Sequence, residues 1–444
     1  MTAPAADLGI EGGTVVTGGG SRPANVYVSG GRVAEVTAEM RPAAERFDAA
    51  GLLVMPGMVD AHVHFMDPAD LEREDFPSGS AAALRSGVTT VIEHTHAAPI
   101  RTAADLVAKV SYLAGRARSD FALGAHAWPG EAAAAAEAWQ AGAAFLKAFT
   151  CTTHGVPGHD AAALRELMGE ARAAGATCLL HCEDESLTAA AEARLQAAGR
   201  RDGGVIPEWR SPEAEMVAVS TAAILARGSG ARVVLAHASS RAVLDAAAGL
   251  VIESCPQYLT LLEEEAVSEG PLRKFTPPAR ARAEPDLLAM WEALAGGRID
   301  YVSSDHAPST RAQKAAGSIW DVHFGLPGID TTFSVLLDGA ARGRLGYERV
   351  VEVYSVAPAR IYGLRGKGSL EPGADADLVL VDPSLEWRVR DEDVISKAGW
   401  SPFTGRTLRG RAVRTYLRGR LAADRGRVLA GPGQGRFLPG PAAR

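Results

Sequence analysis

The sequence contains little cysteine, no excess of basic residues and no long apolar run. Only four of its 444 residues are cysteine and none forms a C-x-x-C pair, which excludes a disulfide framework and a metal or redox site of that type. A formal net charge of −7 gives no positive field for phosphate groups, so a nucleic-acid partner is not expected. We expect four buried free thiols, at Cys151, Cys178, Cys182 and Cys255.

No segment is apolar over the length that a bilayer requires, and the N-terminal residues MTAPAADLGIEGG lack a charged stretch followed by an apolar run. The sequence therefore predicts a cytoplasmic protein without a membrane partner. A hydrophobic content of 47% and a charged content of 22% are typical of a folded globular chain. The length suits a large barrel with a modest second domain.

Eight short apolar runs alternate with alanine-rich stretches that favour helix, such as GEAAAAAEAWQAGA. Strands buried on both faces read as continuous apolar runs, and repeated strand–helix alternation implies a parallel sheet. Eight such units predict a closed (β/α)8 TIM barrel over residues 56–365. The runs are LLVMPGMVDAHVH, GVTTVIEHTH, FALGAHAW, AAFLKAFTC, ATCLLHCED, ARVVLAHASS, GLVIESCPQY and IDYVSSDHAP.

Both ends of the chain are rich in β-forming residues and glycine turns, as in NVYVSGGRVAEV and DADLVLVDPS. Neither end alone makes a stable sheet. We therefore expect residues 1–55 and 366–444 to pair into one small β-sandwich domain beside the barrel. The tail GPGQGRFLPGPAAR is rich in proline and glycine and predicts an extended or mobile arm.

Polar side chains end the eight runs, at the mouth of the barrel where active sites lie. His62 and His64 are one residue apart, so they point to the same side of a strand and can aim at one ion. An isolated H-x-H pair is more often two unrelated histidines. Together with His181, His237 and Asp305, however, the pair forms a ligand set suited to Zn²⁺ and similar divalent ions.

Lys147 places an amine inside the apolar run AAFLKAFTC, where burial disfavours the ammonium form and lowers the pKa. A neutral amine can add carbon dioxide, and the resulting carbamate has two oxygens that can bridge two cations. A lone lysine of this kind more often extends to solvent or forms an ion pair. Its position between the histidine-bearing strands favours the bridging role.

Nine motifs occur in a fixed order along nearly the whole chain: DAHVH, FLKAF, LLHCED, LAHASS, ESCPQYL, TPPAR, SSDHAP, GLPGID and GADADLVLVDP. The ordered set resembles the metal-dependent amidohydrolases that open cyclic amides, namely dihydroorotases, hydantoinases (dihydropyrimidinases) and allantoinases. The resemblance implies two divalent ions, with Zn²⁺ expected, bridged by a CO₂-derived carbamate on Lys147. One ion would be held by His62, His64, Lys147 and Asp305, and the other by Lys147, His181 and His237.

The reaction implied by this resemblance is hydrolysis of a ring C–N bond in a small cyclic amide. Two divalent ions that share a hydroxide present it as a nucleophile at neutral pH, and one ion polarises the ring carbonyl. Asp305 would act as the general base and then as the acid for the departing nitrogen. Glu183 and His306 adjoin ligands and could orient them, although a surface salt bridge is an alternative for Glu183. We also expect a homo-oligomer, a dimer or a tetramer.

Departures from the family patterns bear on the substrate. Dihydroorotases resemble H-x-H-x-R, with the arginine pairing the substrate carboxylate, but Met66 stands at that place and His96 stands where they tend to have asparagine. A methionine cannot offset the desolvation of an anion. Hydantoinases usually have a tyrosine five residues after the bridging lysine, where this chain has Thr152. We interpret the substrate as an uncharged ureide or imide ring, allantoin or a hydantoin first, with dihydroorotate as the alternative.

The expected substrate contacts are Met66, His96, Thr152, Thr276, Pro277 and Gly325. The loops KFTPPAR and GLPGID would offer backbone groups to the ring amide. Two points stay open at this stage. His94 and His96 could line the pocket or pack in the barrel rim, and Arg280 could pair an acidic substituent or form a structural salt bridge.

Two rival functions are open to a chain of this kind. A non-catalytic scaffold similar to the dihydropyrimidinases would keep the fold and lose ligands, but all six ligand positions are retained here. A deaminase that uses one metal ion would not need a bridging lysine on the fourth strand. Both rivals therefore explain the residues less well than a cyclic amidase does.

Overall fold

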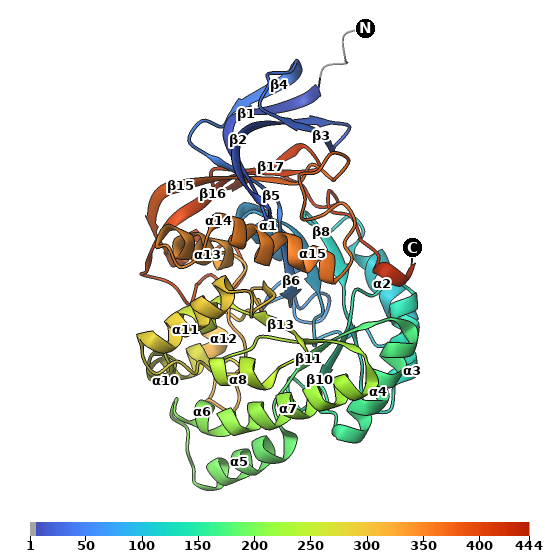
Figure 1. Cartoon of the computed structure of the whole chain (residues 1–444). Helices are drawn as coiled ribbons and strands as arrows, with labels where there is room; N and C mark the ends of the chain where they lie inside the picture. Colours follow the sequence, from blue (N-terminus) through green and yellow to red (C-terminus); the bar gives the residue numbers. More distant parts are fainter. Residues whose placement is uncertain (1–5, 444) are drawn as a thin grey trace.

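The structure of the chain is a computed structural model that describes residues 6–443, so residues 1–5 and 444 of the expected composite domain lie outside the described residues. A barrel of parallel strands is surrounded by helices, with a sheet domain at one end (Figure 1). The predicted (β/α)8 barrel with a β-sandwich domain built from both ends of the chain is confirmed. The domain boundaries, 1–55 plus 366–444 and 56–365, stay a prediction.

The barrel consists of two parallel ladders, one of β6 to β8 and one of β9 to β14. Gly124 separates β8 from β9, which together make the third strand of the barrel. A parallel bridge between Val63 and His306 closes the barrel. The strands are β6 (Met58–Val63), β7 (Val88–Glu93), β8 (Asp120–Leu123), β9 (Ala125–His126), β10 (Leu146–Phe149), β11 (Thr177–His181), β12 (Arg232–Leu235), β13 (Val251–Ser254) and β14 (Tyr301–Val302).

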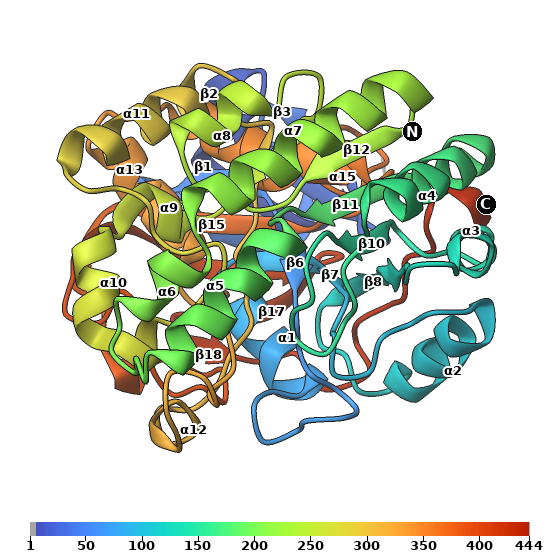
Figure 2. The same ribbon diagram turned by 90° about the horizontal axis from the view of Figure 1, so that it is seen from below.

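Helices enclose these strands (Figure 2), and their ends follow local capping rules. Helix α4 begins after Asp160, whose carboxylate accepts a hydrogen bond from the Ala163 N–H (2.8 Å), and ends at Gly175 with φ 70°. The helices are α1 (Phe76–Arg85), α2 (Ala103–Leu113), α3 (Ala132–Gln140), α4 (Ala161–Ala174), α5 (Glu185–Ala197), α6 (Val205–Trp209), α7 (Pro212–Ser229), α8 (Arg241–Ala246), α9 (Pro256–Thr260), α10 (Glu263–Glu269), α11 (Glu284–Ala295), α12 (Arg311–Ala315), α13 (Thr332–Ala341), α14 (Tyr347–Val351) and α15 (Ala357–Ile361).

The sheet domain joins strands from the two ends of the chain. Its hydrogen-bonded order is β18-β17-β16-β15-β5-β1-β2-β3, and β4 pairs with β1. The join is made by β5 and β15, which run antiparallel with Val54 opposite Leu380. The strands are β1 (Ala6–Thr17), β2 (Gly20–Ser29), β3 (Arg32–Thr37), β4 (Ala43–Asp48), β5 (Leu53–Pro56), β15 (Leu378–Arg388), β16 (Thr407–Leu417), β17 (Arg420–Asp424) and β18 (Arg427–Val428).

A buried ionic cluster connects the sheet domain to the barrel. The amine of Lys367 lies 2.6 Å from Asp120 on β8, 2.7 Å from Asp377 and 2.9 Å from Asp375. Burial would lower the pKa of Lys367, but the three carboxylates raise it above its usual value. The lysine is therefore charged in the folded protein, and it holds together two segments that are far apart in the sequence.

The C-terminal tail is extended, as predicted, and it is tied to the barrel along its length. The Phe121 N–H donates to the Arg436 carbonyl (2.9 Å), and the Leu438 N–H donates to the Phe121 carbonyl (2.7 Å). The tail reaches α3 (Figure 2), and the Gly440 N–H donates to the Gly142 carbonyl just after that helix (2.7 Å). The alternative of a mobile arm is therefore wrong for this segment, because its backbone groups have barrel partners.

All four cysteines are buried and unpaired, which confirms the prediction of free thiols. Among the described residues, no helix combines the length and apolar character needed to cross a membrane.

Candidate metal and active site

A bulge in β6 turns the first two histidines toward the mouth of the barrel. Ala61 lies in the buried cluster inside the barrel, so strict alternation would place His62 on the outer face. Between Asp60 and Val63, however, β6 has one residue more than β7. Such a bulge re-aims the side chains that follow it. The carboxylate of Asp60 fixes the bulge by accepting a hydrogen bond from the Ser304 N–H (3.0 Å).

Two further candidate ligands have a left-handed backbone conformation. His237 follows β12 with φ 43°, and Asp305 follows β14 with φ 48°. Such a conformation is uncommon outside glycine and costs roughly 1–3 kcal/mol, so it persists only where the surroundings enforce it. Lys147 and His181 need no such turn, because each lies two residues after a side chain that faces the barrel interior.

One pocket at the barrel mouth brings all six predicted ligands together. They arrive from β6, β10, β11 and the segments that follow β6, β12 and β14. The ligands that line the pocket are His62, His64, Lys147, His181, His237 and Asp305. The remaining lining residues are Phe149, His154, Thr276, Ala307, Phe324 and Gly325.

Three of the four histidines donate one ring N–H to a fixed acceptor, which leaves the other nitrogen with a lone pair for a metal ion. The bonds run from His62 Nδ1 to Glu253 (2.8 Å), from His64 Nδ1 to the His94 carbonyl (3.2 Å) and from His181 Nε2 to Glu183 (2.7 Å). Burial lowers the pKa of His64 to about 4, and it also lowers that of His181. These neutral rings can act as ligands.

The free ring nitrogens converge in two groups. Nε2 of His62 and Nε2 of His64 lie 3.3 and 3.5 Å from the same oxygen of Asp305. Nδ1 of His181 lies 3.0 Å from Nε2 of His237. The donors therefore fit two divalent cations, one in each group.

Lys147 contributes a buried amine to the same pocket. Within the described part of the chain no carboxylate lies within ion-pair distance of Nζ, which lies 5.0 Å from the centre of the Phe149 ring. Burial lowers the pKa of Lys147 to about 8, against the opposing effect of Glu253 and Asp305. Because its pKa is lowered, Lys147 has more of the neutral form that reaction with carbon dioxide requires than an exposed lysine has.

Two other groups of side chains also have ligand atoms within 4.8 Å of one another, namely His62 with His64 and His94, and Cys151 with His181 and Glu183. The second group is a poor metal site. Burial raises the pKa of Cys151 to about 12, so the thiol keeps its proton. In the first group, the centre of the His94 ring lies 4.5 Å from the ring centre of His62 and 4.4 Å from that of His64. His94 is not among the residues that line the pocket.

Two of the six expected substrate contacts line the pocket, and the other four do not. Thr276 and Gly325 line the pocket. Met66 is fully buried with its sulfur 3.3 Å from the Thr95 hydroxyl, and the Pro277 carbonyl accepts a hydrogen bond from Tyr258 (2.7 Å). The last two, His96 and Thr152, lie outside the lining, with Thr152 exposed and its N–H bonded to Glu185.

Arg280 forms an ion pair with the buried carboxylate of Glu215 (3.3 Å), which favours its structural reading over a role in pairing the substrate. Glu253 was not among the residues predicted from the sequence, although its charge inside the apolar run GLVIESC was a signal. Arg210, which lies 3.3 Å from Glu183, was not predicted either. Although burial acts in the opposite direction, Arg210 and His181 lower the pKa of Glu183 to about 2.

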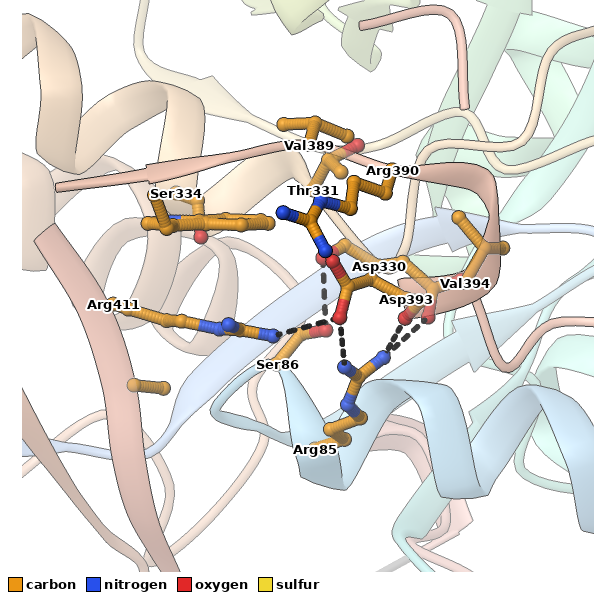
Figure 3. A pocket seen from close by; sticks show the side chains of 12 residues that line it. Arg85, Ser86, Asp330, Thr331, Ser334, Val389, Arg390, Asp393, Val394 and Arg411 are labelled. Atoms are coloured by element: carbon orange, nitrogen blue, oxygen red, sulfur yellow. Dashed lines mark hydrogen bonds and ion pairs between the residues drawn. The ribbon is translucent and has the colours of Figure 1, made fainter. Parts of the chain in front are cut away.

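The loop GLPGID is held in place from two sides. The Nδ1 atom of His306 accepts hydrogen bonds from the N–H groups of Gly328 (3.1 Å) and Ile329 (3.3 Å). On the other side Asp330 faces a pocket at the junction with the sheet domain, where Arg85 extends between Asp330 (3.9 Å) and Asp393 (3.6 Å) (Figure 3). His306 therefore orients this loop.

Comparison with known proteins agrees with this geometry. The family model described as "Amidohydrolase family" matches residues 53–422. An allantoinase of Rubrobacter xylanophilus is 38% identical over 447 residues, which cover 97% of each chain. A dihydroorotase of Halobacterium salinarum is 38% identical over 355 residues, which cover 79% of this chain and 82% of that protein.

Among solved structures, an L-hydantoinase (dihydropyrimidinase) from Arthrobacter aurescens superimposes with a TM-score of 0.93 at 30% sequence identity. The match covers 98% of this chain and all of the other. Both the barrel and the composite sheet domain are therefore part of the likeness.

Proposed function

The chain belongs to the amidohydrolase family, and we propose that it opens an uncharged cyclic amide of the allantoin or hydantoin type. It is a hydrolase of the C–N bond of cyclic amides, in line with its allantoinase and L-hydantoinase relatives. The observation that carries the proposal is the pocket that unites four histidines, Lys147 and Asp305. A scaffold that had lost catalysis would not need three of those histidines anchored by acceptors.

The family is metal-dependent, and we propose two divalent ions, with Zn²⁺ expected. His62, His64 and Asp305 would hold one ion, His181 and His237 the other, and a carbamate on Lys147 would contact both. When bound, such a pair of ions supplies a nucleophilic hydroxide at neutral pH and polarises a carbonyl group. The chelating groups are already close together, which supports a site that needs little rearrangement on loading.

The residues of the chain then bind the ring and move one proton. Thr276 and Gly325 line the pocket, and their backbone groups would contact the ring amide. Asp305 Oδ1, close to both His62 and His64, would take the proton of the attacking group and deliver it to the departing ring nitrogen. The hydroxyl of Thr276 is not free to deliver a proton to the ring nitrogen, because it donates its hydrogen to Glu183 (2.6 Å).

An uncharged ring is favoured because three residues that the sequence suggested near the substrate, Met66, Arg280 and His96, are neutral or already paired. Met66 offers no strong donor. Arg280 pairs with Glu215. Burial, together with the positive charges around it, holds the pKa of His96 well below its usual range, so its ring carries no charge at neutral pH.

One observation favours dihydroorotate as the second candidate. Arg73, on the segment after β6, is buried, its closest carboxylate is Asp70 at 4.0 Å, and its Nη2 has no hydrogen-bond partner among the described residues. Burial is the main cause of the lowered pKa of His96 and of His154, and the charge of Arg73 is a smaller cause in both cases. A guanidinium in this position could pair an acidic substituent, and the Halobacterium relative is named a dihydroorotase.

A hydrolysis screen tests the proposal. The zinc-loaded protein is incubated with allantoin, hydantoin, dihydrouracil, dihydroorotate and phthalimide, and ring opening is followed by the loss of the cyclic amide. We expect the highest kcat/KM for allantoin or hydantoin. A preference for dihydroorotate would establish the second candidate, and no turnover of any ring would contradict both.

Metal analysis tests the site itself. Protein produced with excess zinc should contain close to two ions per chain, and the Lys147→Ala variant should bind fewer because the bridging group is missing. One ion per chain in the wild type, together with an unmodified Lys147 in a crystal structure, would contradict the binuclear site. The expected dimer or tetramer is a separate proposal, which light scattering would test against the chain mass of 46.3 kDa.

A further inference from the structure

The segment after β10 forms a tight turn that carries His154 to the pocket. Thr153 and Val156 exchange two backbone hydrogen bonds (3.1 and 2.8 Å), and the two residues between them have φ values of 53° at His154 and 75° at Gly155. Positive φ at both central positions is typical of a type I′ turn, where glycine, asparagine or aspartate are preferred. A histidine in this conformation is strained, and strain of this kind is concentrated at functional positions.

Two aromatic contacts fix the ring of His154. It stacks on the ring of His96, with centroids 4.0 Å apart and planes inclined by 23°, and it meets Phe324 edge-on at 5.9 Å. Both ring nitrogens of His96 are buried without a hydrogen-bond partner in the described part of the chain. The contact that His96 makes with His154 is therefore stacking: the face of the His96 ring covers one face of the His154 ring.

The ring nitrogens of His154 are available to a ligand. Within residues 6–443 no group forms a hydrogen bond with them, and the side chain lines the pocket that holds the six candidate ligands. Burial and the neighbouring positive charges keep the pKa of His154 well below its usual range, so the imidazole is neutral and has one N–H donor. Thr152, two residues earlier, is exposed and lies outside the lining.

We propose that His154 binds the cyclic amide directly, by donating a hydrogen bond from its ring N–H to the carbonyl oxygen under attack, while His96 holds the ring in place by stacking. This inference rests on the proposed function and names a specificity residue for it. The proton stays on the imidazole throughout, and no bond to His154 forms or breaks. The hydrogen bond strengthens as negative charge develops on the oxygen, so it stabilises the transition state more than the bound substrate.

The test compares three variants of the zinc-loaded full chain. His154→Phe keeps a ring for stacking and removes the donor, His154→Asn restores an N–H donor in a residue that tolerates positive φ, and His323→Phe changes an exposed histidine outside the lining. We expect kcat to fall on the order of 10²-fold or more in His154→Phe with KM nearly unchanged. His154→Asn should recover at least part of that loss, and His323→Phe should match the wild type.

Metal content and melting temperature are measured on the same samples. Unchanged values in His154→Phe, together with the expected loss of kcat, support the proposal. A His154→Phe variant with kcat close to the wild-type value, or one that loses metal and is not rescued by asparagine, would overturn it. A wild-type protein that opens no ring would instead contradict the proposed function, and the inference would fall with it.

Discussion

Glu253 is a fully buried carboxylate with contacts to two candidate ligands. Its Oε2 atom accepts hydrogen bonds from Nδ1 of His62 (2.8 Å) and from the backbone N–H of His237 (3.1 Å). A carboxylate behind a histidine fixes the orientation of the ring and makes the free nitrogen a stronger donor to a metal ion. One residue thereby links the two groups of ligands.

We expect Glu253→Gln to weaken metal binding by about 10- to 100-fold, because an amide accepts less strongly than a carboxylate. Competition with a chromogenic chelator measures the change. Glu215→Gln is the matched control, since Glu215 is also buried but pairs with Arg280 and Ser239. Equal metal affinities in the Glu253 variant and the wild type would show that Glu253 does not support the site.

Asp305→Asn should keep the fold and lose most of the turnover. An amide cannot take the proton of the attacking group, and general base catalysis is worth about 10²- to 10⁴-fold in rate. Part of the metal could be lost as well, because Asp305 lies close to His62 and His64. Steady-state kinetics are therefore read beside metal content. Full metal occupancy with a rate near that of the wild type would mean that another group is the base.

Met66 stands where dihydroorotases have an arginine, so a substrate carboxylate would have no charged partner there. A buried anion without such a partner is strongly disfavoured, and we expect kcat/KM for dihydroorotate to be lower than for hydantoin or allantoin by on the order of 10²-fold or more. The measurement is the ratio of kcat/KM values under identical metal loading. Met66→Arg should move that ratio toward the acid. If the wild type prefers dihydroorotate, Arg73→Gln shows whether Arg73 supplies the missing charge.

At the scale of elements, the C-terminal tail depends on glycine where it touches the barrel. A Cβ at Gly435 would collide with the Ser119 carbonyl oxygen, whereas a Cβ at Gly431 would meet no atom within 4 Å. We expect Gly435→Ala to loosen the tail and Gly431→Ala to leave it in place. Hydrogen exchange at the Leu438 N–H, which donates to the Phe121 carbonyl, reports the difference. Equal protection in both variants would contradict this account.

Elements also differ in how far their sequence reveals their geometry. Lys147 and His181 extend the alternation of β10 and β11, so their inward direction follows from a period of two residues. His62 does not follow that rule, because the bulge in β6 intervenes. His237 and Asp305 depart from it too, because each turns through a left-handed conformation after its strand.

At the scale of the whole molecule, Lys367 holds the sheet domain against the barrel. Lys367→Met would remove the cation shared by the buried carboxylates of Asp120 and Asp377 and the half-buried carboxylate of Asp375, and breaking a buried ion pair in this way typically costs about 3–5 kcal/mol. We expect the melting temperature to fall by several degrees. Lys397→Met is the control, because its ion pair with Asp75 is partly exposed and is worth about 1 kcal/mol or less.

The pH dependence of this contribution follows from the direction of the pKa shift. Since the pKa of Lys367 is raised in the folded state, its stabilisation is fully present below the unfolded pKa, near 10.4, and is lost as the pH rises through the raised value. Wild type and Lys367→Met should therefore differ by a constant amount at neutral pH. A difference that disappears between pH 6 and pH 8 would contradict the assigned charge.

The sequence by itself determined the order of the elements, the barrel with its composite sheet domain, and the six side chains that meet at the mouth. These features follow from local causes: the period of the apolar residues, the position of polar residues at strand ends, and the coordination chemistry of imidazole and carboxylate groups. The ordered motifs, including DAHVH and SSDHAP, also resemble those of the amidohydrolases.

Only the tertiary structure decided which neighbouring groups act on those side chains. Glu253 reaches His62 across 191 positions of the chain, and no local pattern encodes that contact. The choice between Thr152 and His154 depends on a turn closed by two backbone hydrogen bonds, and the pairing of Arg280 depends on Glu215 of another element. Local periodicity fixes which face of an element is buried, whereas partners across the barrel are fixed by how the closed strands pack.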